Sequence, residues 1–196
     1  MGRPRRADRL APLSRALAVQ ARTDPLEDPL SRAPRLVAFD LDDTLAPWEP
    51  VRDDGWFTVE RQRDAIRLLL DDHEQGTCLP HVILDEAGHV VGRITLSGIV
   101  RGPFLSGHLG YFVGADANGR GLATAAVGRM VGLSFDELGL HRVQAATLLH
   151  NVRSQGVLRR NGFVPFGVAP TYLRIAGEWQ DHVLFQRVSE TAPGSA

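Results

Sequence analysis

Lysine is absent from this chain of 196 residues, and all 22 basic residues are arginine. The absence excludes Schiff-base chemistry on a lysine and every mechanism that needs a lysine base. The single cysteine, Cys78, excludes an intramolecular disulfide and is typical of a reducing compartment. We therefore expect a cytoplasmic protein.

Long apolar runs are also missing, because none approaches the roughly 20 residues that span a bilayer. The net charge is only −1, which argues against a protein that binds nucleic acid mainly through charge. The seven histidines show no spacing typical of metal ligands. The basic start of the chain lacks the apolar stretch of a secretory signal. We expect no membrane, nucleic-acid or metal partner.

The rest of the composition is that of a globular protein, with 43% hydrophobic and 23% charged residues. The sequence predicts a poorly patterned segment over residues 1–34, one domain over residues 35–188 and a frayed tail over residues 189–196. Within the first segment, Pro12–Ala21 has helical character, and Thr23–Pro34 has the prolines of a linker.

Helical and strand patterns alternate along the expected domain. Helical spacing of apolar residues covers residues 58–75, 122–138 and 151–161. Strand patterns cover residues 81–84, 90–99, 108–113, 142–148, 163–168, 172–175 and 178–188. Thr58 is the expected N-cap of the first helix. Gly128 and Gly132 each cost the second helix roughly 1 kcal/mol relative to alanine, which favours close packing against a sheet. The order predicts a mixed α/β domain.

A glycine-containing loop joins the strand pattern at 108–113 to the next helix. It reads Asn118-Gly119-Arg120-Gly121-Leu122-Ala123-Thr124. Backbone N–H groups at a turn that opens a helix form an anion site, and glycine permits close approach. The loop has neither the Rossmann spacing nor the lysine of a P-loop. The sequence predicts a diphosphate cradle, with a plain strand–turn–helix joint as the alternative.

Two motifs in this order resemble the GNAT superfamily of N-acetyltransferases. Asn118-x-x-Gly121-x-Ala123 is similar to the family signature Gln/Arg-x-x-Gly-x-Gly/Ala, with Asn at the first position. Asn151-x-x-Ser154, followed by Asn161-Gly162-Phe163, resembles the helix that lies beside the pantetheine arm and thiol in that family. The resemblance implies an acyl-CoA N-acyltransferase fold, with a central, mostly antiparallel sheet flanked by helices, and acetyl-CoA as co-substrate.

Within the superfamily, Leu45–Val188 resembles the ribosomal-protein-alanine N-acetyltransferases of the RimJ/RimL branch. The stretches LAPWEPVRDDGWFT, TLLHNVRSQGVLRRNGF and YLRIAGEWQDHVLF carry this resemblance. It implies direct acetyl transfer to a primary amine, the N-terminal α-amine of a protein, by a monomer or homodimer. A small amine is the alternative acceptor. The expected groove walls are Tyr172–Phe185 with Trp179, and Val51–Thr58.

The resemblance also implies roles at the thiol end. It places the Ser154 hydroxyl near the sulfur, as donor to the leaving thiolate. A strand N–H near Phe112 or Val113 would polarise the carbonyl. The predicted acetyl-CoA-binding residues are Phe112, Val113, Asn118, Gly119, Arg120, Gly121, Leu122, Ala123, Thr124, Asn151 and Ser154.

The base is less well marked by the sequence. His108 lies on the strand that faces the acceptor in the family, and histidine suits proton transfer. Thr171 occupies a position that is often acidic in the family. Asp181 and His182 are weaker candidates in the final hairpin. The α-amine has a pKa of about 7.7–8.0, so water is also an adequate base.

Two other functions fit parts of the chain. An apolar run ending in Asp40-Leu41-Asp42-Asp43-Thr44 resembles the nucleophile motif of haloacid-dehalogenase-type phosphatases, with Asp40 as nucleophile and Asp42 as acid. The lysine of the third motif is missing, which disfavours this interpretation. A non-catalytic acyl-CoA-binding module is the remaining alternative.

Overall fold

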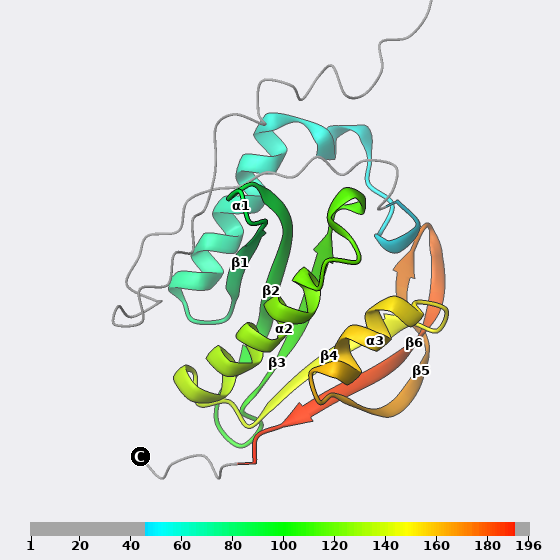
Figure 1. Cartoon of the computed structure of the whole chain (residues 1–196). Coiled ribbons are helices and arrows are strands. Elements are labelled where there is room, and N and C mark those ends of the chain that lie inside the picture. The colour runs from blue at the N-terminus through cyan, green and yellow to red at the C-terminus, as the bar shows by residue number, and fades with distance from the viewer. Residues whose placement is uncertain (1–45, 191–196) are drawn as a thin grey trace, which may run out of the picture.

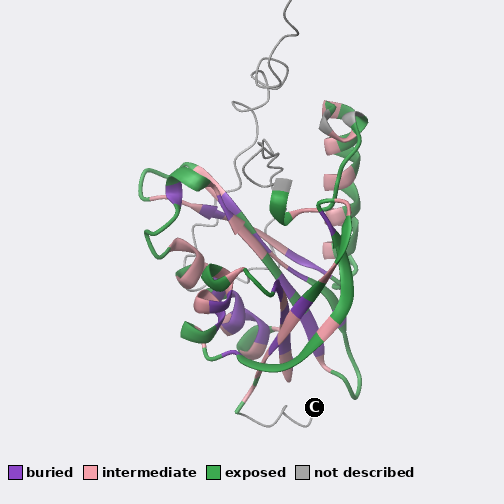
Figure 2. Ribbon diagram, turned by 90° about the vertical axis from the view of Figure 1, so that its right-hand side faces the viewer, coloured by how far each residue is buried: buried purple, intermediate pink, exposed green. Residues whose placement is uncertain are grey.

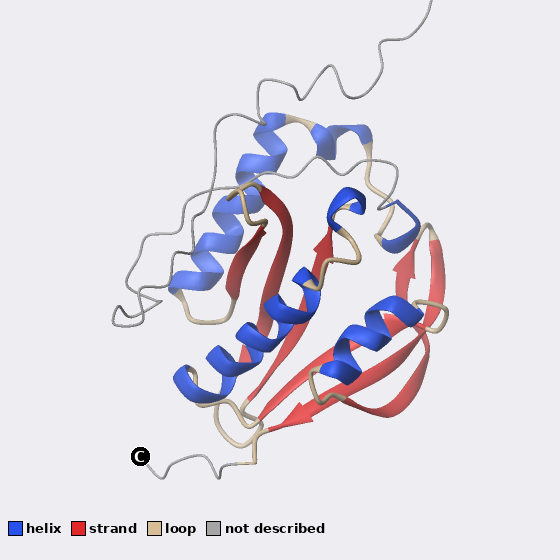
Figure 3. Cartoon of the chain, viewed as in Figure 1, coloured by secondary structure: helices blue, strands red, loops and turns tan. Residues whose placement is uncertain are grey.

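The computed structural model describes residues 46–190, which form one six-stranded sheet with helices on both faces (Figure 1). Its strands are β1 (Leu79–Leu84), β2 (Val90–Val100), β3 (Ser106–Val113), β4 (Arg142–Leu148), β5 (Val164–Ile175) and β6 (Glu178–Val188). Its helices are α1 (Val59–Glu74), α2 (Leu122–Gly132) and α3 (Val152–Arg160). Shorter helical segments are η2 (Ala46–Trp48), η3 (Asp54–Phe57), η4 (Ala115–Ala117) and the π-helical η5 (Leu133–Glu137), as drawn in Figure 3.

The strands lie in the order β1-β2-β3-β4-β6-β5, and every neighbouring pair is antiparallel except β3 and β4. These two parallel strands pair only where residues 106–108 face residues 142–144. Beyond His108 and Gln144 they share no pair, and they diverge. The predicted mixed, mostly antiparallel sheet is confirmed, and its middle is only partly joined.

The core lies between the sheet and the two later helices. Helices α2 and α3 cover one face, and α1 lies on the opposite face (Figures 1 and 2). The largest fully buried apolar side chains come from both layers: Leu96, Val127, Met130, Val143, Leu158 and Phe185. Each stabilises the fold by about 1.5–3 kcal/mol relative to an exposed position. None of the helices formed by residues 46–190 has the length and apolar character needed to cross a membrane.

Local signals explain where several elements begin and end. Thr58 caps α1 as predicted, since its hydroxyl accepts a hydrogen bond from the Arg61 N–H at 3.3 Å. The β5–β6 connection is the two-residue turn Ala176–Gly177, and both residues have positive φ, at 51° and 88°. Such turns match the twist of the flanking strands. The last hairpin therefore has a well-defined tip.

Three expectations differ from the structure. The second helix was expected over 122–138, but α-helical geometry ends at Gly132 and continues as η5. The expected strands at 163–168 and 172–175 are one strand, β5, with a bulge between Ala169 and Leu173. A Cβ on Gly128 would meet the Asn161 side chain at 3.0 Å. This glycine therefore makes room for Asn161, which follows α3, and not for a strand of the sheet.

The expected helix at Pro12–Ala21, the linker at Thr23–Pro34 and the Asp40–Thr44 motif lie outside the described residues.

Candidate active site

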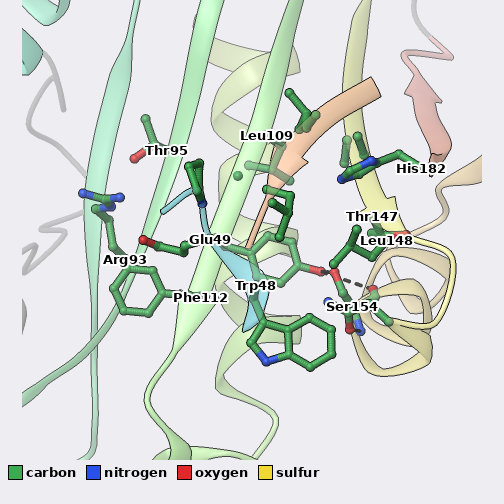
Figure 4. Close-up of a pocket in the computed structure, with 18 of the residues that line it drawn as sticks. Trp48, Glu49, Arg93, Thr95, Leu109, Phe112, Thr147, Leu148, Ser154 and His182 are labelled. Atoms are coloured by element: carbon green, nitrogen blue, oxygen red, sulfur yellow. Dashed lines mark hydrogen bonds between the residues drawn. The ribbon is translucent and has the colours of Figure 1, made fainter. Parts of the chain in front are cut away.

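A cavity of about 360 Å³ opens where β3 and β4 diverge (Figure 4). Its lining includes Tyr111, which contacts α3, and Phe112, which alternation places on the other face of β3. Its walls come from β2, β3, β4, α3, the final hairpin and the segment before α1. The lining residues include Trp48, Glu49, Pro50, Arg52, Arg93, Tyr111, Phe112, Ala146, Leu148, Asn151, Ser154, Leu173, Ile175 and His182.

The predicted diphosphate loop lies at the N-terminus of α2. Gly119 and Gly121 have φ values of 78° and 81°, which disfavour other residues. Nothing lies within 4 Å of the position that a Cβ would take on either glycine. Gly121 precedes the helix, and its carbonyl accepts the hydrogen bond from Ala125 N–H at 3.0 Å. The N–H groups of the first turn have no partner within the helix, so this end of α2 fits an anion.

The thiol end is built by Tyr111 and Ser154. The Tyr111 Oη atom lies 2.8 Å from Ser154 Oγ and 3.2 Å from the Ser154 carbonyl oxygen. Asn151 caps α3, since its Oδ1 accepts from the Ser154 N–H at 3.0 Å. Gln155 Nε2 donates to the Leu149 carbonyl at 2.9 Å, which holds α3 to the end of β4. The hydroxyl pair is therefore fixed from both the sheet and the helix.

Tyr111 keeps its proton in this setting. Burial raises the pKa of Tyr111, while the hydrogen bond with Ser154 and the charge of Arg160 act in the opposite direction. A neutral phenol donates one hydrogen bond, and a serine hydroxyl both donates and accepts. When Tyr111 donates to Ser154 Oγ rather than to the Ser154 carbonyl, the Ser154 proton becomes available to a third atom in the cavity.

Another side of the cavity is bounded by residues 48–50 and Arg52. The Glu49 carbonyl accepts a hydrogen bond from the Ala176 N–H at 3.0 Å, which ties this segment to the hairpin tip. The rings of Trp48 and His150 lie 5.4 Å apart. Desolvation lowers the pKa of Arg93, the nearby Glu49 carboxylate raises it, and Arg52 lowers it further. The Glu49 side chain points toward Arg93 in Figure 4.

The final hairpin contributes His182, which is 3% exposed, together with Leu173 and Ile175. His182 Nδ1 lies 2.9 Å from the Gln180 carbonyl oxygen. The preceding residue, Asp181, is exposed, and its carboxylate accepts from the Thr171 N–H at 2.8 Å.

The structure brings some predicted site residues together and separates others. Asn151, Ser154 and Phe112 line the cavity. The loop of residues 118–124 and the end of β3 at Val113 lie outside its lining. His108 is exposed on β3, does not line the cavity and pairs in register with Ser97.

The expected groove walls are partly matched. Hairpin residues do line the cavity, but Trp179 is 64% exposed and is not among them. From the segment before α1, the lining residues are 48–50 and Arg52 rather than the whole of 51–58.

Sequence reasoning missed Tyr111, Arg93 and residues 48–50. A signal for Tyr111 was present, because alternation places it on the same face of its strand as Leu109 and Val113. A buried tyrosine hydroxyl usually has a polar partner. Within residues 46–190, no group of three or more His, Cys, Asp or Glu side chains is arranged to hold a metal ion.

Comparison with known proteins shows the same family along most of the chain. The family model of the acetyltransferase (GNAT) domain matches residues 27–164. The [ribosomal protein uS5]-alanine N-acetyltransferase of Escherichia coli K12 is 34% identical over 141 residues, which are 71% of this chain and 73% of that protein.

Two solved structures are similar in both sequence and fold. The ribosomal-protein-S5-alanine acetyltransferase of Vibrio fischeri has a TM-score of 0.71 and 35% identity, with coverage of 76% of this chain and 81% of that chain. Mycobacterium smegmatis RimJ, in complex with CoA-disulfide, has a TM-score of 0.72 and 32% identity, with coverage of 78% and 74%.

Proposed function

The chain belongs to the GNAT acetyltransferase family and is an N-acetyltransferase close to the RimJ type, and on this premise we propose that it moves acetyl from acetyl-CoA to the N-terminal α-amine of a protein. A ribosomal protein that begins with Ala or Ser is the proposed acceptor, and the cytoplasm is the proposed compartment. The single observation that carries the proposal is the cavity between β3 and β4, with a polar hydroxyl pair on one side and an open anion cradle nearby.

We propose that the start of α2 binds the diphosphate of acetyl-CoA. The support is the positive φ of Gly119 and Gly121, the open space beside both, and the N–H groups of the first helical turn. Arg120 is exposed in the same loop and adds a positive charge. The acyl arm would then enter the gap between β3 and β4, toward Ser154. In this arrangement the reacting thioester lies beside the hydroxyl pair.

Ser154 is the proposed proton donor to the departing thiolate, and Tyr111 is its partner. As the amine nitrogen bonds to the carbonyl carbon, the carbon–sulfur bond breaks and the sulfur takes a proton. The 2.8 Å contact lets Tyr111 donate to Ser154 Oγ while Ser154 gives up its own proton. The pair therefore stabilises charge that develops only in the transition state. A backbone N–H of β3 near Phe112 or Val113 is proposed to polarise the carbonyl.

A small primary amine is the second candidate acceptor. The observation that favours it is the hydrogen bond between the Glu49 carbonyl and the Ala176 N–H, which closes the acceptor side toward the hairpin tip. A protein N-terminus must pass beside this tie, whereas a small amine fits inside a cavity of about 360 Å³.

One acetylation screen tests both acceptors. The purified protein and acetyl-CoA are incubated with Ala- and Ser-starting peptides, free amino acids, aminoglycosides and blocked peptides with an internal Lys. We expect acetylation of the Ala- and Ser-starting peptides at their α-amine. Acetylation of small amines alone would contradict the protein acceptor and leave the reaction class intact. Acetyl-CoA binding without any turnover would indicate a non-catalytic module.

A further inference from the structure

A buried histidine faces the acceptor side of the cavity. His182 lies on β6 opposite Leu148 of β4 and Ala169 of β5, and only 3% of it is exposed. Figure 4 shows its imidazole extending from β6 into the cavity. Buried polar groups are normally paired, so the partner of each imidazole nitrogen indicates what His182 does.

The hydrogen bond at Nδ1 determines the tautomer of His182. Nδ1 lies 2.9 Å from the Gln180 carbonyl oxygen. A carbonyl only accepts, so Nδ1 carries the hydrogen and Nε2 of the neutral ring has a lone pair. Nε2 makes no hydrogen bond with any residue between 46 and 190. The ring is therefore oriented with a proton acceptor directed away from the backbone.

The bulge of β5 holds the ring from its other side. Residues 170–172 face the single residue Asp181 on β6, and the Asp181 carboxylate accepts from the Thr171 N–H at 2.8 Å. Thr171 has a φ of 47°, an uncommon value for a β-branched residue. The bulge directs the Tyr172 ring onto His182, with 5.5 Å between ring centroids. Bulges often redirect a side chain next to a site.

The other candidate bases are less suitable in position. His108 is exposed and does not line the cavity. The Asp181 carboxylate is exposed and engaged with Thr171. Glu49 lines the cavity, but it points toward Arg93, whose pKa its charge raises. Tyr111 is paired with Ser154.

We propose that His182 is the general base of the reaction and takes the amine proton on Nε2. This inference rests on the proposed acetyl transfer. Nε2 first takes one proton from the ammonium form of the acceptor, and the neutral amine then attacks the carbonyl carbon. As the nitrogen–carbon bond forms, the amine loses a second proton to water. As the carbon–sulfur bond breaks, the thiolate takes a proton from Ser154. The imidazolium then loses its proton to water, and the Ser154 hydroxyl is restored by a proton from solvent, so atoms and charges balance.

Ionisable side chains near His182 also affect the pH dependence of the reaction. The neighbouring wall of β4 carries Ala146, Thr147 and Leu148, none of which ionises, and α3 contributes the uncharged Asn151 and Ser154. Within residues 46–190, the ionisable side chains that line the cavity besides His182 are Glu49, Arg52, Arg93 and Tyr111. Tyr172 lies outside the lining and contacts the His182 ring.

The test compares wild type with His182→Asn over pH, with an Ala-starting peptide as acceptor. The Asn amide retains a donor toward the Gln180 carbonyl but has no nitrogen lone pair. We expect kcat to fall on the order of 100-fold at about pH 7. The deficit should shrink toward about pH 9.5, because the α-amine is neutral there without help from a base. A purely structural role of His182 gives a deficit that does not change with pH, and this result would overturn the proposal.

Controls separate this proposal from the proposed function. His108→Asn should match wild type across the pH range. Calorimetry should give the same acetyl-CoA affinity for the His182 variant as for wild type. A wild-type protein that acetylates no amine contradicts the function, whereas an active wild type with a constant deficit contradicts the base alone.

A measurement on wild type covers the outcome in which the variant does not fold. Nitrogen-15 correlation spectra distinguish the two neutral imidazole tautomers, and we expect His182 to carry its hydrogen on Nδ1. A ring with its hydrogen on Nε2 would exclude it as the base.

Discussion

Tyr111 and Ser154 are 43 residues apart in the chain, yet their hydroxyl oxygens lie 2.8 Å apart in the wall of the cavity. Tyr111 comes from β3, and Ser154 comes from the first turn of α3. The contact joins the sheet to the helix on one side of the gap between β3 and β4. It predicts that the two side chains act as one unit.

Removal of either hydroxyl should slow the chemical step. We expect Ser154→Ala to lower kcat on the order of 100-fold and Tyr111→Phe to lower it less, with little change in acetyl-CoA affinity. The double variant should be about as slow as Ser154→Ala, because residues that act as a unit are not additive. Steady-state kinetics and calorimetry on the three variants check this. Losses that simply multiply would contradict a shared proton path.

Gly121→Glu tests the diphosphate cradle. The new carboxylate would lie at the start of α2 and repel an anion there. We expect acetyl-CoA affinity to fall at least about 10-fold, since each lost hydrogen bond to a charged group costs about 1.5–3 kcal/mol. Isothermal titration calorimetry measures the change.

Gly76→Glu is the matched control for this change. Gly76 has a φ of 71°, compared with 81° for Gly121, and a Cβ at either position meets nothing within 4 Å. The backbone cost should therefore be similar, but Gly76 follows the C-terminal end of α1, whereas Gly121 lies at the start of α2. Equal acetyl-CoA affinities in the two variants would remove the diphosphate from the start of α2.

The junction of α2 and α3 predicts a coupling between Gly128 and Asn161. Asn161 Nδ2 donates to the Thr124 carbonyl at 3.1 Å and to the Val157 carbonyl at 3.0 Å. We expect Asn161→Ala to lower the free energy of unfolding by about 1–2 kcal/mol. Gly128→Ala should stabilise that variant by about 1 kcal/mol through helix propensity. In wild type the same change meets Asn161 Oδ1 at 3.0 Å and should lose this gain.

Urea unfolding of the four proteins in this cycle measures the coupling. A Gly128→Ala effect that is the same with and without Asn161 would show that the two residues do not interact.

His81 should make the fold sensitive to acid. Burial, followed by the charges of His73 and Arg129, lowers the pKa of His81 from 6.5 to about 4. Between these values the unfolded chain binds a proton that the folded chain does not, so acid favours unfolding. The contribution is fully present above about pH 6.5 and is lost toward pH 4, at about 1.4 kcal/mol per pH unit.

His81→Phe isolates this contribution. The variant lacks the titrating group and also the His81 Nδ1 atom, which is buried without a hydrogen-bond partner in the structure. Its free energy of unfolding, measured with urea between about pH 7.5 and about pH 4.5, should fall less steeply than that of wild type. Identical slopes would contradict a buried neutral imidazole.

The sequence predicted features that depend on neighbours along the chain. The Thr58 cap follows from a side chain that accepts from the N–H group three residues later. The strands follow from alternation, and the Ala176–Gly177 turn follows from two residues that join them. The fold family followed from two motifs in fixed order.

The remainder depends on contacts between distant segments. The β5 bulge is held by Asp181 from the next strand, ten residues away from Thr171, so residues 163–175 alone predict two strands. The change from α2 to the π-helical η5 has no marker that we find in residues 133–137. Residues 48–50 reach the cavity through a bond to Ala176, and no periodicity carries that information.

Three residue pairs join β3 to β4. The sheet therefore consists of two three-stranded ribbons, β1-β2-β3 and β4-β6-β5, which pair with each other at residues 106–108 and 142–144. A ligand in the gap would contact both ribbons, since residues of both line the cavity. Occupancy of the cavity should therefore protect backbone amides on both ribbons from hydrogen exchange together. The bound substrate would then stabilise the sheet across the gap between β3 and β4.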